Sequence, residues 1–79
     1  MVHIEISVYI HGIILEYTER STCIVELEKG KTVSDLIHNL GIQYDLVGTV
    51  QLNRERIVGK DYQLQNNDRI DLYPFFGGG

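Results

Sequence analysis

Residues 22–41 read TCIVELEKGKTVSDLIHNLG, and the spacing of their apolar side chains changes half-way along. Alternate positions from 23 to 27 are apolar, a period of two that is typical of a half-buried strand. From Val33 onward the apolar residues recur three and four positions apart, which is typical of an amphipathic helix. The stretch therefore predicts a strand, a turn and a helix in direct succession.

Residues that favour helix ends lie on both sides of the predicted helix. Thr32 and Asp35 match the N-terminal pattern in which a hydroxyl is followed three residues later by a carboxylate. Gly41 can adopt the left-handed conformation that ends many helices. The apolar stripe between these ends consists of Val33, Leu36, Ile37 and Leu40. We therefore expect a short helix that packs on a sheet.

Four further segments have strand patterns. Residues 2–10 alternate strictly, and shorter extended runs follow at 47–52, 56–58 and 69–73, the last ending at Pro74. The order strand, strand, helix, strand, short strand, strand predicts an α+β fold of the β-grasp type. We expect a mixed sheet of four or five strands on one main helix. Residues 1–74 would form this domain and residues 75–79 a flexible C-terminal tail.

Composition excludes several classes of function. The chain has 79 residues and a formal net charge of −4, and its basic residues are scattered, which argues against a nucleic-acid partner. The single cysteine excludes an internal disulfide, and residues 1–10 show neither a basic leader nor an apolar signal core. We therefore expect a soluble, cytoplasmic protein with no membrane association. The mild acidity suits a basic protein partner, and solubility alone explains it equally well.

No group of residues predicts a catalytic centre. The three histidines lack the spacing of a metal site. Cys23 lies on the apolar face of its strand, where a thiol is usually a small hydrophobe, and Glu26 and Glu28 have the pattern of a solvated surface. Gly30 has no further glycines with which to build a phosphate-binding loop. We expect no bound metal or cofactor.

The most informative segment is the ending PFFGGG at residues 74–79. Glycines lack a Cβ, so they can pass extended through a narrow channel and bring a terminal carboxylate to a reactive phosphate. A carboxylate activated as an acyl-adenylate can then be attacked by sulfur or by an amine. Three glycines can also be a poorly ordered tail without function, but their combination with a β-grasp pattern favours the chemical role.

Several motifs resemble the ThiS/MoaD family of ubiquitin-like sulfur carriers. They are GKTVSDLI at 30–37, LGI at 40–42, Asn53, DYQL at 61–64, Asn67-Asp68 and the terminal glycines, and together they cover nearly the whole chain. The stretch HGIILEYT at 11–18 is similar to the segment after the first strand of the molybdopterin-synthase small subunit. The resemblance implies a ubiquitin-like β-grasp fold and favours the MoaD-like branch.

The resemblance also assigns roles to the tail. Gly79 would carry the carboxylate that is adenylated and converted to a thiocarboxylate, and Gly78 would be the second residue of the terminal glycine pair. Phe75 and Phe76 would lie at the base of the tail, where partners dock. Gly77 stands at a position that is variable in the family.

Partners follow from the same resemblance. It implies an E1-like adenylating enzyme of the MoeB/ThiF type that uses ATP, a sulfur-donor enzyme, and a sulfur-accepting synthase such as the molybdopterin synthase large subunit or thiazole synthase. The chain would be a protein cosubstrate rather than an enzyme, or the small subunit of a molybdopterin synthase-type sulfurtransferase. Two alternatives share the fold, a ubiquitin-like modifier joined to lysine and a β-grasp interaction module with incidental glycines.

Two turns and one connection depart from simple patterns. Asn53-Arg54 and Asn67-Asp68 stand where the family has Asn-Gly and Gly-Asp. Asparagine tolerates the left-handed conformation, so we expect the turn at Asn67 to form without glycine. The connection at 12–21 is too long for a tight hairpin. Its apolar residues, which either tuck under the sheet or face a partner, are Ile13, Ile14, Leu15 and Tyr17.

Overall fold

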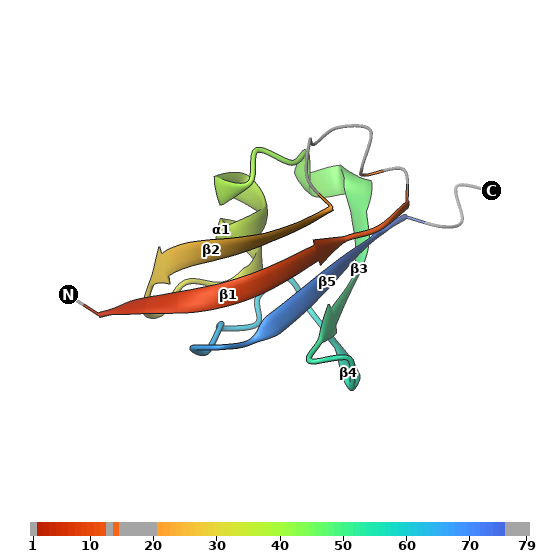
Figure 1. The fold of residues 1–79 in the computed structure, drawn as a ribbon. Helices are drawn as coiled ribbons and strands as arrows, with labels where there is room; N and C mark the ends of the chain where they lie inside the picture. Colours follow the sequence, from red (N-terminus) through yellow and green to blue (C-terminus); the bar gives the residue numbers. More distant parts are fainter. Residues whose placement is uncertain (1, 13, 15–20, 76–79) are drawn as a thin grey trace.

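A computed structural model describes residues 2–12, 14 and 21–75 of the chain (Figure 1). Its elements are β1 (His3–Ile10), β2 (Thr22–Glu28), α1 (Val33–Asn39), the short 3₁₀ helix η2 (Tyr44–Leu46), β3 (Val47–Leu52), β4 (Arg56–Val58) and β5 (Arg69–Pro74). The strand and helix segments that the sequence predicts are therefore confirmed in kind and in order.

The five strands form one mixed sheet in the order β2-β1-β5-β3-β4. β1 and β5 are parallel, and the other neighbouring strands are antiparallel. α1 lies against one face of this sheet, and the other face is open (Figure 1). This architecture confirms the predicted ubiquitin-like β-grasp fold.

The core lies between α1 and the inner face of the sheet. Every second residue of β1 is buried there, and the apolar stripe of α1 packs against it. Ile14 is also fully buried, so the connection after β1 sends at least this side chain inward. Cys23 is half-buried against the core, as expected for a small hydrophobe. The predictions for Ile13, Leu15 and Tyr17 lie outside the described residues.

The ends of α1 match their predicted caps. The Thr32 hydroxyl accepts a hydrogen bond from the Asp35 backbone N–H at 3.3 Å, and the Thr32 N–H donates to Asp35 Oδ2 at 2.8 Å. The bond from the Thr32 backbone is the main cause that lowers the pKa of Asp35. Gly41 follows the helix with φ +73°, in the left-handed region that glycine enters easily.

Side chains stabilise the two turns that lack glycine. Asn53, Arg54 and Asn67 have positive φ values of 53°, 59° and 70°. The Asn53 amide donates to Asp68 Oδ1 at 3.3 Å and accepts from the Arg69 N–H at 2.7 Å. Asp68 Oδ2 also accepts from the Tyr62 hydroxyl at 3.1 Å. A buried carboxylate, Asp68, therefore joins both turns, and the expectation for Asn67 is confirmed.

Candidate functional site

The structure fixes the base of the predicted functional tail. Phe75 follows β5 directly, and 70% of its surface is exposed. The predicted roles of Phe76, Gly77, Gly78 and Gly79 concern residues outside the described part of the chain. The site is therefore built from the residues that determine where and how the chain leaves the sheet.

The tail starts from the middle of the sheet rather than from an edge. β5 lies between β1 and β3, and Pro74 is opposite Val47 of β3 (Figure 1). On the other side, the His11 N–H donates to the Leu72 carbonyl at 3.0 Å and so extends the pairing beyond β1. A strand paired on both sides has little freedom to move, so β5 is held as far as Leu72 on both sides and as far as Pro74 on the β3 side, directly before Phe75.

Two glycines make room for the chain at this exit. A Cβ on Gly48 would lie 2.6 Å from the Cα of Phe75, which no real side chain could tolerate. The register of β3 against β5 shifts between Val47 and Thr49, so Gly48 marks an irregularity of the bulge type. A Cβ on Gly12 would lie 2.7 Å from Pro74 Cγ, and Gly12 also has φ +66°. The sequence interpretation missed Gly48, although a glycine inside a strand pattern indicates a close backbone approach.

A carboxylate is buried on the open face of the sheet beside the exit. Asp71 of β5 is only 2% exposed. Its Oδ1 accepts from Arg69 Nε at 2.8 Å, and its Oδ2 accepts from Arg69 Nη2 at 3.1 Å and lies 2.8 Å from His11 Nε2. Burial acts to raise the pKa of Asp71, but the hydrogen bonds with Arg69 and His11 outweigh it and lower the pKa. In turn, the bond to Asp71 raises the pKa of Arg69.

Aromatic rings hold the two partners of Asp71 in place. The Arg69 guanidinium lies 3.7 Å from the centre of the Tyr9 ring, a cation–π contact. The His11 ring stacks on Tyr73 with centroids 4.4 Å apart and an angle of 8° between the planes. The sequence interpretation placed Tyr9, Arg69, Asp71 and Tyr73 in strands and His11 just after the first strand, without seeing that they meet. We call the five residues Tyr9, His11, Arg69, Asp71 and Tyr73 the outer cluster.

The outer cluster and its surroundings have the composition of a protein interface. Tyrosine and arginine are enriched at such interfaces and often dominate their binding energy. Phe75 continues the alternation of β5, which places it on the same open face, and Ile57 of β4, opposite Gln51, adds a side chain that is 71% exposed. The geometry can therefore present the base of the tail next to a surface suited to another protein.

A comparison with protein families now identifies the chain. The model of the ThiS family matches residues 8–79. The chain belongs to the ThiS family. No curated protein sequence matches it.

Solved structures support the fold of this ThiS-family chain. The HVO 2177 protein of Haloferax volcanii is similar with a TM-score of 0.80 and 19% identity, covering 98% of this chain and 88% of that one. A putative molybdopterin converting factor subunit 1 of Pyrococcus furiosus is similar with a TM-score of 0.74 and 18% sequence identity. The match covers 90% of this chain and 97% of that one. Small archaeal modifier protein 1 of H. volcanii is similar with a TM-score of 0.73 and 17% sequence identity, and the match covers 90% of this chain and 97% of that one. The predicted resemblance to ThiS/MoaD proteins is confirmed.

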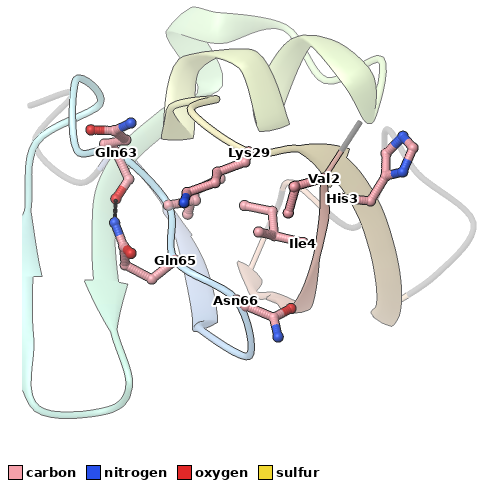
Figure 2. Close-up of a pocket in the computed structure, with 8 residues that line it drawn as sticks. Val2, His3, Ile4, Lys29, Gln63, Gln65 and Asn66 are labelled. Carbon is pink, nitrogen blue, oxygen red and sulfur yellow. Dashed lines mark hydrogen bonds between the residues drawn. The ribbon is translucent and has the colours of Figure 1, made fainter.

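A hollow lies at the other end of β1, far from the tail. Figure 2 shows Lys29 reaching across it toward Gln63 and Gln65, with Val2 and Ile4 beside it. The amide of Asn66 at its rim is already used, because its Oδ1 accepts from the Glu5 N–H at 2.8 Å. The hollow is open, and the described residues that line it include His3 and Lys29 but no carboxylate.

The described part of the chain offers neither a metal cluster nor a membrane-spanning helix. No three His, Cys, Asp or Glu side chains among residues 2–12, 14 and 21–75 gather in a way that could hold a metal ion. Within the same ranges, no helix is long and apolar enough to cross a membrane.

Proposed function

We propose that this chain is a sulfur carrier whose reactive group is the carboxylate of Gly79. The observation that supports this most is a glycine-rich tail that leaves the centre of a ThiS-family sheet from a rigid base at Pro74 and Phe75. The receiving pathway that we favour is molybdopterin or tungstopterin biosynthesis, with thiamine thiazole synthesis next. The chain binds no cofactor and acts as a protein cosubstrate.

The proposed chemistry takes place in the active sites of other enzymes. In an E1-like adenylating enzyme, an oxygen of the Gly79 carboxylate attacks the α-phosphorus of ATP, and pyrophosphate leaves. The persulfide sulfur of a donor enzyme then attacks the acyl carbon, and AMP leaves. A thiol next attacks the donor's sulfur in the acyl disulfide, so that the thiocarboxylate leaves, a disulfide forms, and one oxygen has been replaced by sulfur. Gly78 and Gly77 offer no side chain to a narrow channel. In a synthase, the thiocarboxylate sulfur finally forms a bond to the acceptor, and water cleaves the acyl–sulfur bond and regenerates the Gly79 carboxylate.

The open face of the sheet is the surface that we assign to these partners. Phe75 and Phe76 would fill partner pockets, and the outer cluster would surround them with charged and aromatic groups. If the synthase holds the chain during turnover, the chain is also the small subunit of a molybdopterin synthase-type sulfurtransferase. By itself it would transfer no sulfur.

A protein modifier is the second candidate. It is favoured by the structural similarity to a protein whose name is small archaeal modifier protein 1, at a TM-score of 0.73. The activated Gly79 would then be attacked by a lysine amine, and an isopeptide bond would form with loss of AMP. A third candidate, an interaction module with incidental glycines, requires neither activation nor a free carboxylate.

Intact mass spectrometry distinguishes the three functions. The chain is recovered from its own cells, or after incubation with ATP, the activating enzyme and a sulfur donor. A gain equal to one oxygen replaced by sulfur, absent when Gly79 is deleted, is the expected result for the carrier. Lysine-linked conjugates without this gain would support the modifier. An unchanged mass beside an active activating enzyme would leave the interaction module.

A further inference from the structure

The two edges of the sheet differ in length and in protection. β4 forms one edge with only three residues, whereas β2 forms the other with seven. Natural sheets protect exposed edges with proline, lysine, bulges or very short strands, because free backbone groups invite another strand. β2 has no proline or lysine, and its pairing with β1 runs without a bulge from Thr22 to Glu28. Among residues 2–12, 14 and 21–75, no strand pairs with its outer side, so β2 is a long and regular edge (Figure 1).

The hydrogen bonds show which groups of β2 are free. The Lys29 N–H donates to the Val2 carbonyl at 2.9 Å, and the Ile10 N–H donates to the Ser21 carbonyl at 2.7 Å. Hydrogen-bonded and non-hydrogen-bonded pairs alternate along an antiparallel ladder. The backbone N–H and carbonyl groups of the odd-numbered residues of β2 therefore point toward β1, and those of the even-numbered residues point away from the sheet. The Glu28 carbonyl accepts from the Lys31 N–H, but no residue among 2–12, 14 and 21–75 bonds the other outward backbone groups.

The side chains along this edge differ between the two faces. On the inner side, Cys23 and Val25 are half-buried and leave apolar surface beside α1. On the open side, Glu26 is directly opposite Glu5 of β1, and Glu28 follows two residues later. Like charges in opposite positions repel, and in the described residues no ion pair neutralises these carboxylates. The edge therefore has an apolar inner side and an open side that carries the exposed Ile24 and, beyond it, the carboxylates of Glu26 and Glu28.

We propose that the edge of β2 binds an extended segment of a partner protein in which apolar residues alternate with lysine or arginine. The segment adds a sixth strand, and its main chain bonds the outward N–H and carbonyl groups of Ile24 and Glu26. Its apolar side chains contact Cys23 and Val25, and its basic side chains reach Glu26 and Glu28. In such strand additions, main-chain bonds supply affinity and alternate side chains supply specificity.

Charge decides between a partner and a second copy of this chain. Pairing of two β2 edges would bring a second Glu26 and a second Glu28 to the same edge of an acidic protein with net charge −4. A basic segment neutralises the same carboxylates. The added strand would also leave the tail free, because β1 separates β2 from β5. A protein bound at the β2 edge and an enzyme bound at the tail could therefore occupy the chain at the same time.

The test uses a synthetic peptide, acetyl-KVKVKVK-amide, titrated into the isotope-labelled full chain. We expect saturable binding, with amide shift changes concentrated in β2 and slower hydrogen exchange at Ile24 and Glu26. The same peptide with N-methyl groups on the backbone nitrogens of its lysines, which would face Ile24 and Glu26, and the acidic peptide acetyl-EVEVEVE-amide, should not bind. Shift changes centred on the outer cluster, equal binding of the N-methylated peptide, or no saturation in the millimolar range would overturn the proposal.

Matched variants test the charge and the main chain separately. Glu26→Lys should weaken binding about tenfold, and Glu55→Lys, an equal charge change in the β3–β4 turn, should not. Ile24→Pro removes an outward N–H without touching the ladder with β1, so it should abolish the slowed exchange at Glu26 while the β1 and β5 amides keep their shifts. Equal weakening by Glu26→Lys and Glu55→Lys would show non-specific attraction and refute the site.

Discussion

The inner and outer faces of the sheet use the same five strands in different ways. On the inner face, apolar residues at every second position of β1 and β5 pack against α1. On the outer face, Asp71 is just as deeply buried, but under the charged and aromatic side chains of Arg69 and His11. A repeating pattern of apolar residues thus determines the inner face, whereas the outer face depends on contacts such as that of His11 with Asp71, which are 60 positions apart in the sequence. The predictions below test how much each face contributes.

The largest effect is expected on the inner face. Ile6 is fully buried, so Ile6→Ala should lower the free energy of unfolding by about 3–4 kcal/mol through lost burial and a cavity. Ile24 is 68% exposed on the outer face, and Ile24→Ala should change the free energy of unfolding by less than about 0.5 kcal/mol. Urea unfolding of both variants measures the difference. Similar losses would show that the two faces do not differ as described.

The second effect tests the buried carboxylate of the outer face. Asp71→Asn keeps the shape but removes the charge that pairs with Arg69, and we expect a loss of about 2 kcal/mol in unfolding free energy. Arg69 is partly exposed and can turn toward water, which keeps the loss below that of a fully buried pair. Asp45→Asn, on the surface, is the control. If Asp71→Asn left the free energy of unfolding unchanged, the outer cluster would contribute no more to stability than an ordinary surface group.

The third effect concerns the exit of the tail, where the faces meet. Gly48→Ala places a methyl group against the backbone of Phe75, and we expect a loss of about 1–2 kcal/mol with shifted amide signals around Phe75. The methyl group of Gly59→Ala would meet only the side-chain carboxylate of Asp61, which can move away. Calorimetry and amide spectra of both variants suffice. Unchanged Phe75 signals in Gly48→Ala would mean that the tail base is less constrained.

The inner face was predictable because its signals are local and periodic. Alternation from Val2 to Ile10 and the spacing from Val33 to Leu40 each fix a face without knowledge of the rest of the chain. The same holds for the Thr32 cap. Local chemistry therefore sufficed for the order of elements, and the order sufficed for the β-grasp fold.

The outer cluster and the exit could not be predicted in this way. The contact of His11 with Asp71 depends on the parallel pairing of β1 with β5, and no local pattern reports which strands become neighbours. Gly48 makes sense only once Phe75 is known to pass beside it. The terminal glycines were recognised by resemblance, and their role stays a prediction, since they lie outside the described residues.

The smallest effect is the dependence of this comparison on pH. The pKa of Asp71 is lower in the folded chain than in the unfolded chain, where it is about 3.9. Its contribution is therefore fully present above that value and is lost as the pH falls through the folded pKa. Asp71→Asn lacks this group, so the difference in unfolding free energy between wild type and variant should narrow below about pH 4 and stay constant above pH 5. Ile6→Ala removes no titrating group, and its deficit should not change with pH. If the difference in unfolding free energy for Asp71→Asn were equally constant with pH, packing rather than charge would stabilise the outer face. Both faces of the sheet would then be stabilised in the same way.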